Sequence, residues 1–161
     1  MAKDKNITLA AEYFNKAVNS QVKGKIDTAI ENYRSSIEIF PTAETHVHLG
    51  VAYSLRGCYE EAISECKTAI ELNHNIGLPY NNIGEYLMSL GRIDEAIEWL
   101  EKALTFEDCT MNYQTYLNLG RIYEKKWDLV KALRFYNHSL DFYPDFDDAQ
   151  DAIIRISSLM N

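Results

Sequence analysis

The chain repeats one alanine-centred pattern four times, at Ala29, Ala62, Ala96 and Ala132, with intervals of 33, 34 and 36 residues. Around each alanine, apolar or small residues fall three and four positions apart, which is the spacing of one face of an α-helix. A second stretch with the same rhythm precedes each of the last three alanines, at residues 46–57, 80–91 and 116–127. Because neither helix of such a pair can bury its apolar stripe alone, neighbouring units have to stack.

Glycine and acidic residues mark the turn inside each unit. Gly24, Gly57 and Gly91 end the first helices of three units, where a residue without a Cβ can adopt the left-handed conformation of a helix C-cap. The second helices then open with acidic pairs, Glu60–Glu61 and Asp94–Glu95, whose charge is favourable near a helix N-terminus. The sequence therefore predicts an all-α chain built from units of helix, tight turn and helix.

This unit resembles the tetratricopeptide repeat (TPR), a unit of about 34 residues with aromatic, leucine, glycine and tyrosine positions in its first helix, and alanines and a proline later. The fourth unit matches every position by residue class, with Tyr116, Leu119, Gly120, Tyr123, Ala132, Tyr136, Ser139 and Pro144. The first unit is the most divergent, because Lys16 and Ser20 replace its leucine and tyrosine. Terminal repeats often diverge in this way, because one of their faces meets water.

The resemblance implies an α-solenoid: a right-handed superhelix of four TPR units and a capping helix, forming one domain over residues 1–161. The units are expected at about residues 10–42, 43–76, 77–110 and 113–146. The capping helix is expected at about 146–159, with an apolar stripe of Ala149, Ala152, Ile153, Ile156 and Leu159. Two extra residues near 109–112 predict a slightly longer loop between the third and fourth units.

Composition narrows the classes of partner. With 24 acidic and 16 basic residues, and a formal net charge of −8, the chain is expected not to bind nucleic acid. A short basic cluster is interpreted as a solvated face beside acidic neighbours: Arg121, Lys125, Lys126, Lys131 and Arg134. No stretch approaches the roughly 20 apolar residues of a membrane span, so no membrane insertion is expected. Without a signal-like apolar run, and with three cysteines but no C-x-x-C pair, the expected location is cytoplasmic, unless a targeting segment precedes this sequence.

In TPR proteins the first helices of successive units line a concave groove in which partner proteins usually lie. The resemblance assigns apolar residues to the N-terminal half of this groove: Phe14, Val18, Val22, Val47, Val51, Leu55 and Leu78. It assigns a more polar set to the C-terminal half: Asn81, Asn82, Glu85, Met88, Leu117, Asn118, Arg121 and Lys125. We expect the apolar half to take an apolar strip of peptide or an amphipathic helix, and the polar half to set its register. The alternative is that several of these residues pack between helices and meet no ligand.

The predicted groove does not match the TPR domains that clamp the C-terminal carboxylate of a chaperone. If that clamp began at the first unit, its cationic positions would hold Phe14, Leu78 and Asn82. If it began at the second unit, they would hold Val47, Gln114 and Asn118. Because none of these side chains is cationic, tight binding of a chaperone tail is not expected.

No pattern indicates catalysis, a metal site or a cofactor. His46 and His48 are two positions apart, whereas a helical metal pair needs three or four, and His46 is expected to replace a packed aromatic residue. The acidic run at 145–151 lacks the glycine and the terminal glutamate of an EF-hand loop. Glu85 and Arg121 are interpreted as a salt bridge between adjacent units. The sequence therefore predicts that the chain is not an enzyme.

The leading prediction is a protein-interaction adaptor or scaffold that binds a peptide or helix of another protein. One alternative is a small cytosolic TPR chaperone that shelters an apolar segment of a client, as in bacterial secretion systems. Another is a scaffold that assembles from copies of itself, so a homo-oligomer stays open as a prediction.

Overall fold

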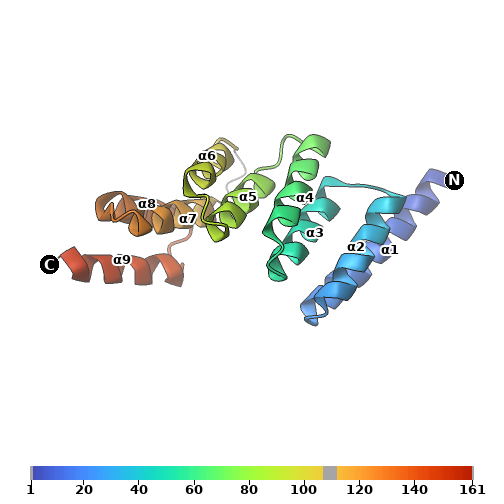
Figure 1. Ribbon diagram of the computed structural model, residues 1–161, viewed down its shortest axis with the longest axis horizontal. Coiled ribbons are helices and arrows are strands. Elements are labelled where there is room, and N and C mark those ends of the chain that lie inside the picture. The colour runs from blue at the N-terminus through green and yellow to red at the C-terminus, as the bar shows by residue number, and fades with distance from the viewer. Residues whose placement is uncertain (1, 107–111, 161) are drawn as a thin grey trace. The chain divides into compact units, whose positions relative to one another are not determined.

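The computed structural model describes residues 2–106 and 112–160, and the regular elements in those ranges are all helices. They are α1 (Ala2–Val22), α2 (Ile26–Ile39), α3 (Ala43–Leu55), α4 (Tyr59–Leu72), α5 (Leu78–Ser89), α6 (Ile93–Ala103), α7 (Asn112–Lys125), α8 (Leu129–Phe142) and α9 (Asp147–Met160) (Figure 1). The predicted pairs of helices are confirmed. Helix α1 begins well before residue 10, and most of the predicted longer loop at 109–112 lies outside the described residues.

Tight turns join the helices of each of the first three pairs, as the glycines predict. Gly24, Gly57 and Gly91 have φ angles of 71°, 76° and 76°, in the left-handed region where a side chain is disfavoured. The residue after each glycine donates its backbone N–H to a carbonyl of the preceding helix; for example, Arg92 donates to Leu87 over 2.9 Å. The acidic pairs lie in the first turns of α4 and α6, also as predicted.

Small residues allow the two helices of a pair to approach closely. The four repeated alanines are fully buried. A Cβ added to Gly84 would lie 2.5 Å from Cγ of Leu100, and one added to Gly120 would lie 2.5 Å from Cε1 of Tyr136. A side chain at either glycine would therefore push its helix away from its partner.

The chain divides into two compact units, Met1–Asn75 with helices α1–α4 and Ile76–Asn161 with helices α5–α9. The single domain and the superhelix expected over the whole chain stay predictions.

In the first unit, α2 packs against both α1 and α3. Tyr33 is fully buried, and its hydroxyl donates to Oε1 of Gln21 over 3.0 Å. Ser36, also buried, donates its Oγ–H to the carbonyl of Ala10 over 2.8 Å. Arg34 donates to the hydroxyl of Tyr53 over 2.6 Å. These bonds satisfy polar groups that would otherwise be costly to bury.

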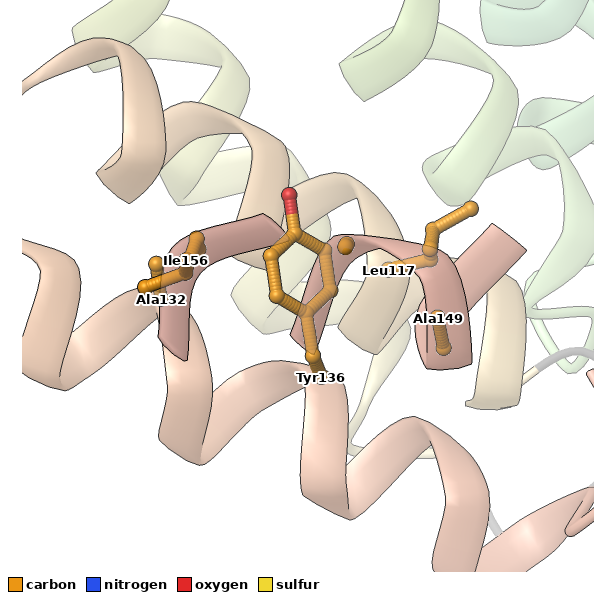
Figure 2. Close-up of a cluster of buried hydrophobic side chains, with 6 residues drawn as sticks. Leu117, Ala132, Tyr136, Ala149 and Ile156 are labelled. Atoms are coloured by element: carbon orange, nitrogen blue, oxygen red, sulfur yellow. The ribbon is translucent and has the colours of Figure 1, made fainter. Parts of the chain in front are cut away.

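In the second unit, α8 packs between α7 and α9. Figure 2 shows the ring of Tyr136 in the middle of their shared core, which consists of Leu117, Ala132, Tyr136, Ala149, Ala152 and Ile156. The predicted capping helix is thus confirmed as α9, which covers the last pair. The predicted stripe is wrong at Leu159, which is exposed near the end of α9 instead of packed in this core.

Candidate partner-binding surfaces

The predicted apolar groove residues of the first unit fall into two groups. Val47 is buried, and Phe14, Val18 and Val51 are half-buried. The ring of Phe14 lies edge-on to His48, with ring centroids 5.0 Å apart, and it also contacts Tyr33. Most of the surface of these residues therefore stabilises the packing of α1, α2 and α3.

Val22 and Leu55 form the second group. They are the last residues of α1 and α3, two positions before the turn glycines, and they lie 33 residues apart, at equivalent positions of successive pairs. Val22 is 83% exposed and Leu55 is 59% exposed. These two side chains are therefore accessible to a partner.

The predicted asparagines of the second unit are buried and bonded to one another. Oδ1 of Asn81 accepts hydrogen bonds from Thr115 over 3.0 Å and from Asn118 over 3.4 Å, which joins α5 to α7. Asn82 and Leu117 are also buried. These four predicted groove residues, Asn81, Asn82, Leu117 and Asn118, pack inside their own unit, and a role in partner contact stays a prediction for them.

The exposed predicted residues of the second unit are Leu78, Glu85, Arg121 and Lys125, and Met88 is half-buried. The expected ion pair of Glu85 with Arg121 is not formed, because the guanidinium of Arg121 lies 2.8 Å from Asp148 of α9 instead. Glu85 and Arg121 do line one shallow hollow, of about 250 Å³. The aspartate run that opens α9 thus supplies an ion-pair partner that the repeat pattern did not indicate.

A larger hollow, of about 450 Å³, lies among the ends of α5, α7, α8 and α9. We call it the α7–α9 hollow, and its lining residues are Met88, Arg121, Glu124, Lys125, Trp127, Leu129 and Leu159. It brings together three predicted groove residues, Met88, Arg121 and Lys125. It also contains Trp127, Leu129 and Leu159, to which the repeat pattern assigns no ligand role, because they lie in the turn, at the start of the second helix and in the capping helix.

Trp127 is the most unusual residue of this hollow. Its φ is 58°, so it adopts the left-handed backbone that glycine adopts in the other three turns. Its N–H donates to the carbonyl of Glu124 over 3.0 Å, as the N–H of Gly91 donates to Met88 over 3.1 Å. A non-glycine residue in this conformation costs about 1–2 kcal/mol. The tryptophan side chain is nevertheless 77% exposed, so packing within its unit offsets little of that cost.

Glu124 is a half-buried, charge-paired residue that lines this hollow. Its carboxylate accepts a hydrogen bond from the hydroxyl of Tyr136 over 2.7 Å and pairs with Arg155 of α9 over 2.8 Å. Burial raises the pKa of Tyr136 above its ordinary value, and the hydrogen bond to Glu124 raises it further. The negative charge of Glu124 is therefore neutralised by its own unit.

Three members of the basic cluster have acidic partners. Arg121 pairs with Asp148, Lys126 with Asp94 over 2.8 Å, and Lys131 with Asp128 over 3.6 Å. The hydrogen bond that Lys126 donates to Asp94 raises the pKa of Lys126. Within residues 2–106 and 112–160, Lys125 has no such partner.

His46 is buried, as expected for a residue that replaces a packed aromatic. Its Nδ1 lies 2.6 Å from Oε2 of Glu65 on α4.

Across the described residues, no cluster of three or more His, Cys, Asp or Glu side chains has the arrangement of a metal site. Among the same residues, no helix is both long enough and apolar enough to span a membrane.

Three curated relatives share sequence with the chain. It is 32% identical over 91 residues to the small glutamine-rich tetratricopeptide repeat-containing protein 2 of Mycosarcoma maydis. The aligned region covers 56% of this chain and 25% of that protein. It is 36% identical over 111 residues to the uncharacterized protein ycf37 of Guillardia theta, and the aligned region covers 65% of this chain and 61% of that protein. It is 28% identical over 102 residues to the photosystem I assembly protein Ycf3 of Prochlorococcus marinus, covering 56% and 59%. The chain thus spans less than two thirds of each relative.

Solved structures share the fold. A structure of pilF from Pseudomonas aeruginosa superposes with a TM-score of 0.83 at 19% identity, covering 97% of this chain and 69% of that one. The second TPR domain of Spaghetti (RPAP3), solved with a bound HSP90 peptide, superposes with a TM-score of 0.60 at 27% identity, covering 64% and 96%.

The sequence profile of the tetratricopeptide repeat matches residues 41–106 and 75–145. The matched residues include the second, third and fourth helix pairs, and the all-α repeat fold agrees with them. The TPR fold supports a role as a protein-interaction scaffold. The chain belongs to the tetratricopeptide repeat family.

Proposed function

We propose that the chain is a non-catalytic adaptor that binds an apolar segment of another protein through the turn-proximal ends of its first helices. The observation that carries this proposal is the exposure of Val22 and Leu55 at equivalent positions of α1 and α3. Their neighbours Phe14 and Val47 are largely covered by their own unit, so a partner would contact these two side chains first.

The expected affinity is modest. Full burial of a valine or a leucine contributes about 1.5–3 kcal/mol, so covering both contributes about 3–6 kcal/mol before the costs of association. Further contacts are needed to reach micromolar binding, which corresponds to about 8 kcal/mol. The RPAP3 domain supports this mode of action, because a related TPR domain was solved with a peptide of its partner.

A client chaperone or assembly factor is the second candidate. The relative Ycf3 is named a photosystem I assembly protein, and a protein that handles unassembled subunits needs exposed apolar surface. Such a function uses the same two side chains but differs in kinetics, because a chaperone holds its client stably until assembly. We propose a cytoplasmic location for either function, since the thiols of Cys58 and Cys66 are both free, which fits a reducing compartment.

The test is a capture experiment with the doubly substituted chain Val22→Asp/Leu55→Asp. The matched control is Leu72→Asp, because Leu72 is also an exposed apolar residue at a helix end, but it lies on the second helix of its pair. We expect the double variant to lose the proteins that the native chain retains, and the control to keep them. Circular dichroism shows whether each variant folds. Equal capture by all three chains would refute the proposal.

A further inference from the structure

The geometry points to a second peptide site, the α7–α9 hollow, in which Trp127 anchors a short acidic segment carrying one bulky apolar side chain. This inference rests on the proposed function, since it names a kind of partner segment. It uses residues of the second unit, however, and is independent of Val22 and Leu55.

Trp127 lies at an unusual position for its residue type. Gly24, Gly57 and Gly91 occupy this position in the first three turns. In the fourth turn the residue is Trp127, and it has the same left-handed backbone conformation and the same backbone hydrogen bond. The residue strains the backbone, and its ring is 77% exposed. By contrast, the other tryptophan of the described chain, Trp99, is half-buried against the ring of Tyr80, with centroids 5.6 Å apart. Backbone strain that packing does not offset is characteristic of functional positions.

Apolar side chains surround Trp127 in the hollow. Met88, Leu129 and Leu159 line the same hollow, and Leu159 is left exposed near the end of α9. The volume of about 450 Å³ is enough for a bulky side chain and part of its backbone. Tryptophan is also a residue type that dominates binding energy at protein interfaces. An apolar side chain of a partner therefore has a preformed place beside Trp127.

The hollow also carries a positive charge. The negative charge of Glu124 is paired with Arg155, and the positive charge of Arg121 is paired with Asp148. Among the side chains lining the hollow, all of which the structure describes, the one charge left without a partner is the ammonium of Lys125. A carboxylate next to the apolar anchor would pair with it, whereas a basic group there would be repelled.

The test is a selection of displayed random peptides on the full chain, followed by titration of the enriched peptides. We expect the enriched peptides to carry Asp or Glu near a bulky apolar residue. In a Trp99→Phe background, their binding is expected to shift the fluorescence of Trp127 to shorter wavelength, because the ring becomes buried. Failure to enrich any peptide, or enrichment of basic peptides, would overturn the proposal.

Two substitutions locate the site. Trp127→Gly restores the residue of the other turns and is expected to weaken binding of the enriched peptides roughly tenfold or more, with thermal stability equal or higher. Trp127→Asn, which tolerates the left-handed backbone, is the second variant if the glycine chain folds poorly. Lys125→Glu is expected to shift the selection toward basic peptides, whereas the matched exposed residue Lys23→Glu leaves it unchanged.

The outcome distinguishes this site from the proposed function. If peptides bind Trp127→Gly as tightly as the native chain but lose affinity for Val22→Asp/Leu55→Asp, the α7–α9 hollow is not a site and the adaptor function stands. If Trp127→Gly alone removes binding, the hollow is established as a site of its own.

Discussion

The first and fourth helix pairs have the same interior and different surfaces. Tyr33 and Tyr136 are both fully buried, and Ser36 and Ser139 donate to the carbonyls of the partner helices over 2.8 and 2.7 Å. The two pairs differ at their turns. The last residue of the first helix is the exposed Val22 in the first pair and Lys125 in the fourth, and the left-handed turn residue two positions later is Gly24 in the first pair and Trp127 in the fourth. The repeat therefore determines how a pair packs, and departures from the repeat at the turns determine what the pair presents to partners.

The largest expected effect concerns the shared interior. Tyr136→Ala removes the central side chain of its core and should lower the free energy of unfolding by about 3–5 kcal/mol, as should Tyr33→Ala in the first unit. Thermal or urea unfolding, followed by circular dichroism, measures both. If only one of the two substitutions is destabilising, the two interiors are not equivalent.

The turns should respond in opposite directions. Gly91→Ala forces a side chain into the left-handed backbone and should destabilise the chain by about 1–2 kcal/mol. Trp127→Gly relieves the same strain but gives the unfolded chain more freedom, which costs about 0.5–1 kcal/mol, so its stability should be unchanged or slightly higher. Melting temperatures of the two variants test this. A clear loss of stability in Trp127→Gly would mean that the tryptophan has a structural role.

The buried serines should have smaller and equal effects. Ser36→Ala and Ser139→Ala each remove one hydrogen bond between helices and should cost about 1 kcal/mol. The control is Ser35→Ala, because Ser35 donates only to Glu31 of its own helix over 3.0 Å and should be near neutral. Unequal losses at the two buried serines, measured by urea unfolding, would show that the two pairs pack differently.

The smallest effect is a pH dependence confined to the first unit. Burial against Phe14 and Tyr33 lowers the pKa of His48 below its ordinary 6.5, although Glu44 opposes this. The unfolded chain therefore binds a proton more readily, and stability should be lost as the pH falls below about 6.5. His48→Phe should reduce this loss, and melting temperatures between neutral and mildly acidic pH measure it. An unchanged pH profile in that variant would assign the effect to another group.

Much of the fold could be predicted from the sequence, because the TPR pattern is local and repeated. The glycines at 24, 57 and 91 and the acidic pairs at 60–61 and 94–95 identified the turns and the starts of the second helices. The same pattern does not identify Trp127 as a turn residue, because tryptophan is not a residue type that favours the left-handed conformation.

The candidate site could be predicted only in part. The pattern identifies a position such as Asn81 but does not indicate whether its amide faces a ligand or a neighbouring helix, and here it bonds to Thr115 and Asn118. The contribution of Leu159 to the α7–α9 hollow depends on how α9 packs, which the repeat pattern does not describe.

The most direct test of the adaptor function is the affinity of one captured partner for the native chain and for Val22→Asp/Leu55→Asp, measured by isothermal titration calorimetry. We expect the double variant to bind at least roughly tenfold more weakly, because two apolar side chains are no longer buried. Equal affinities of two folded chains would contradict it.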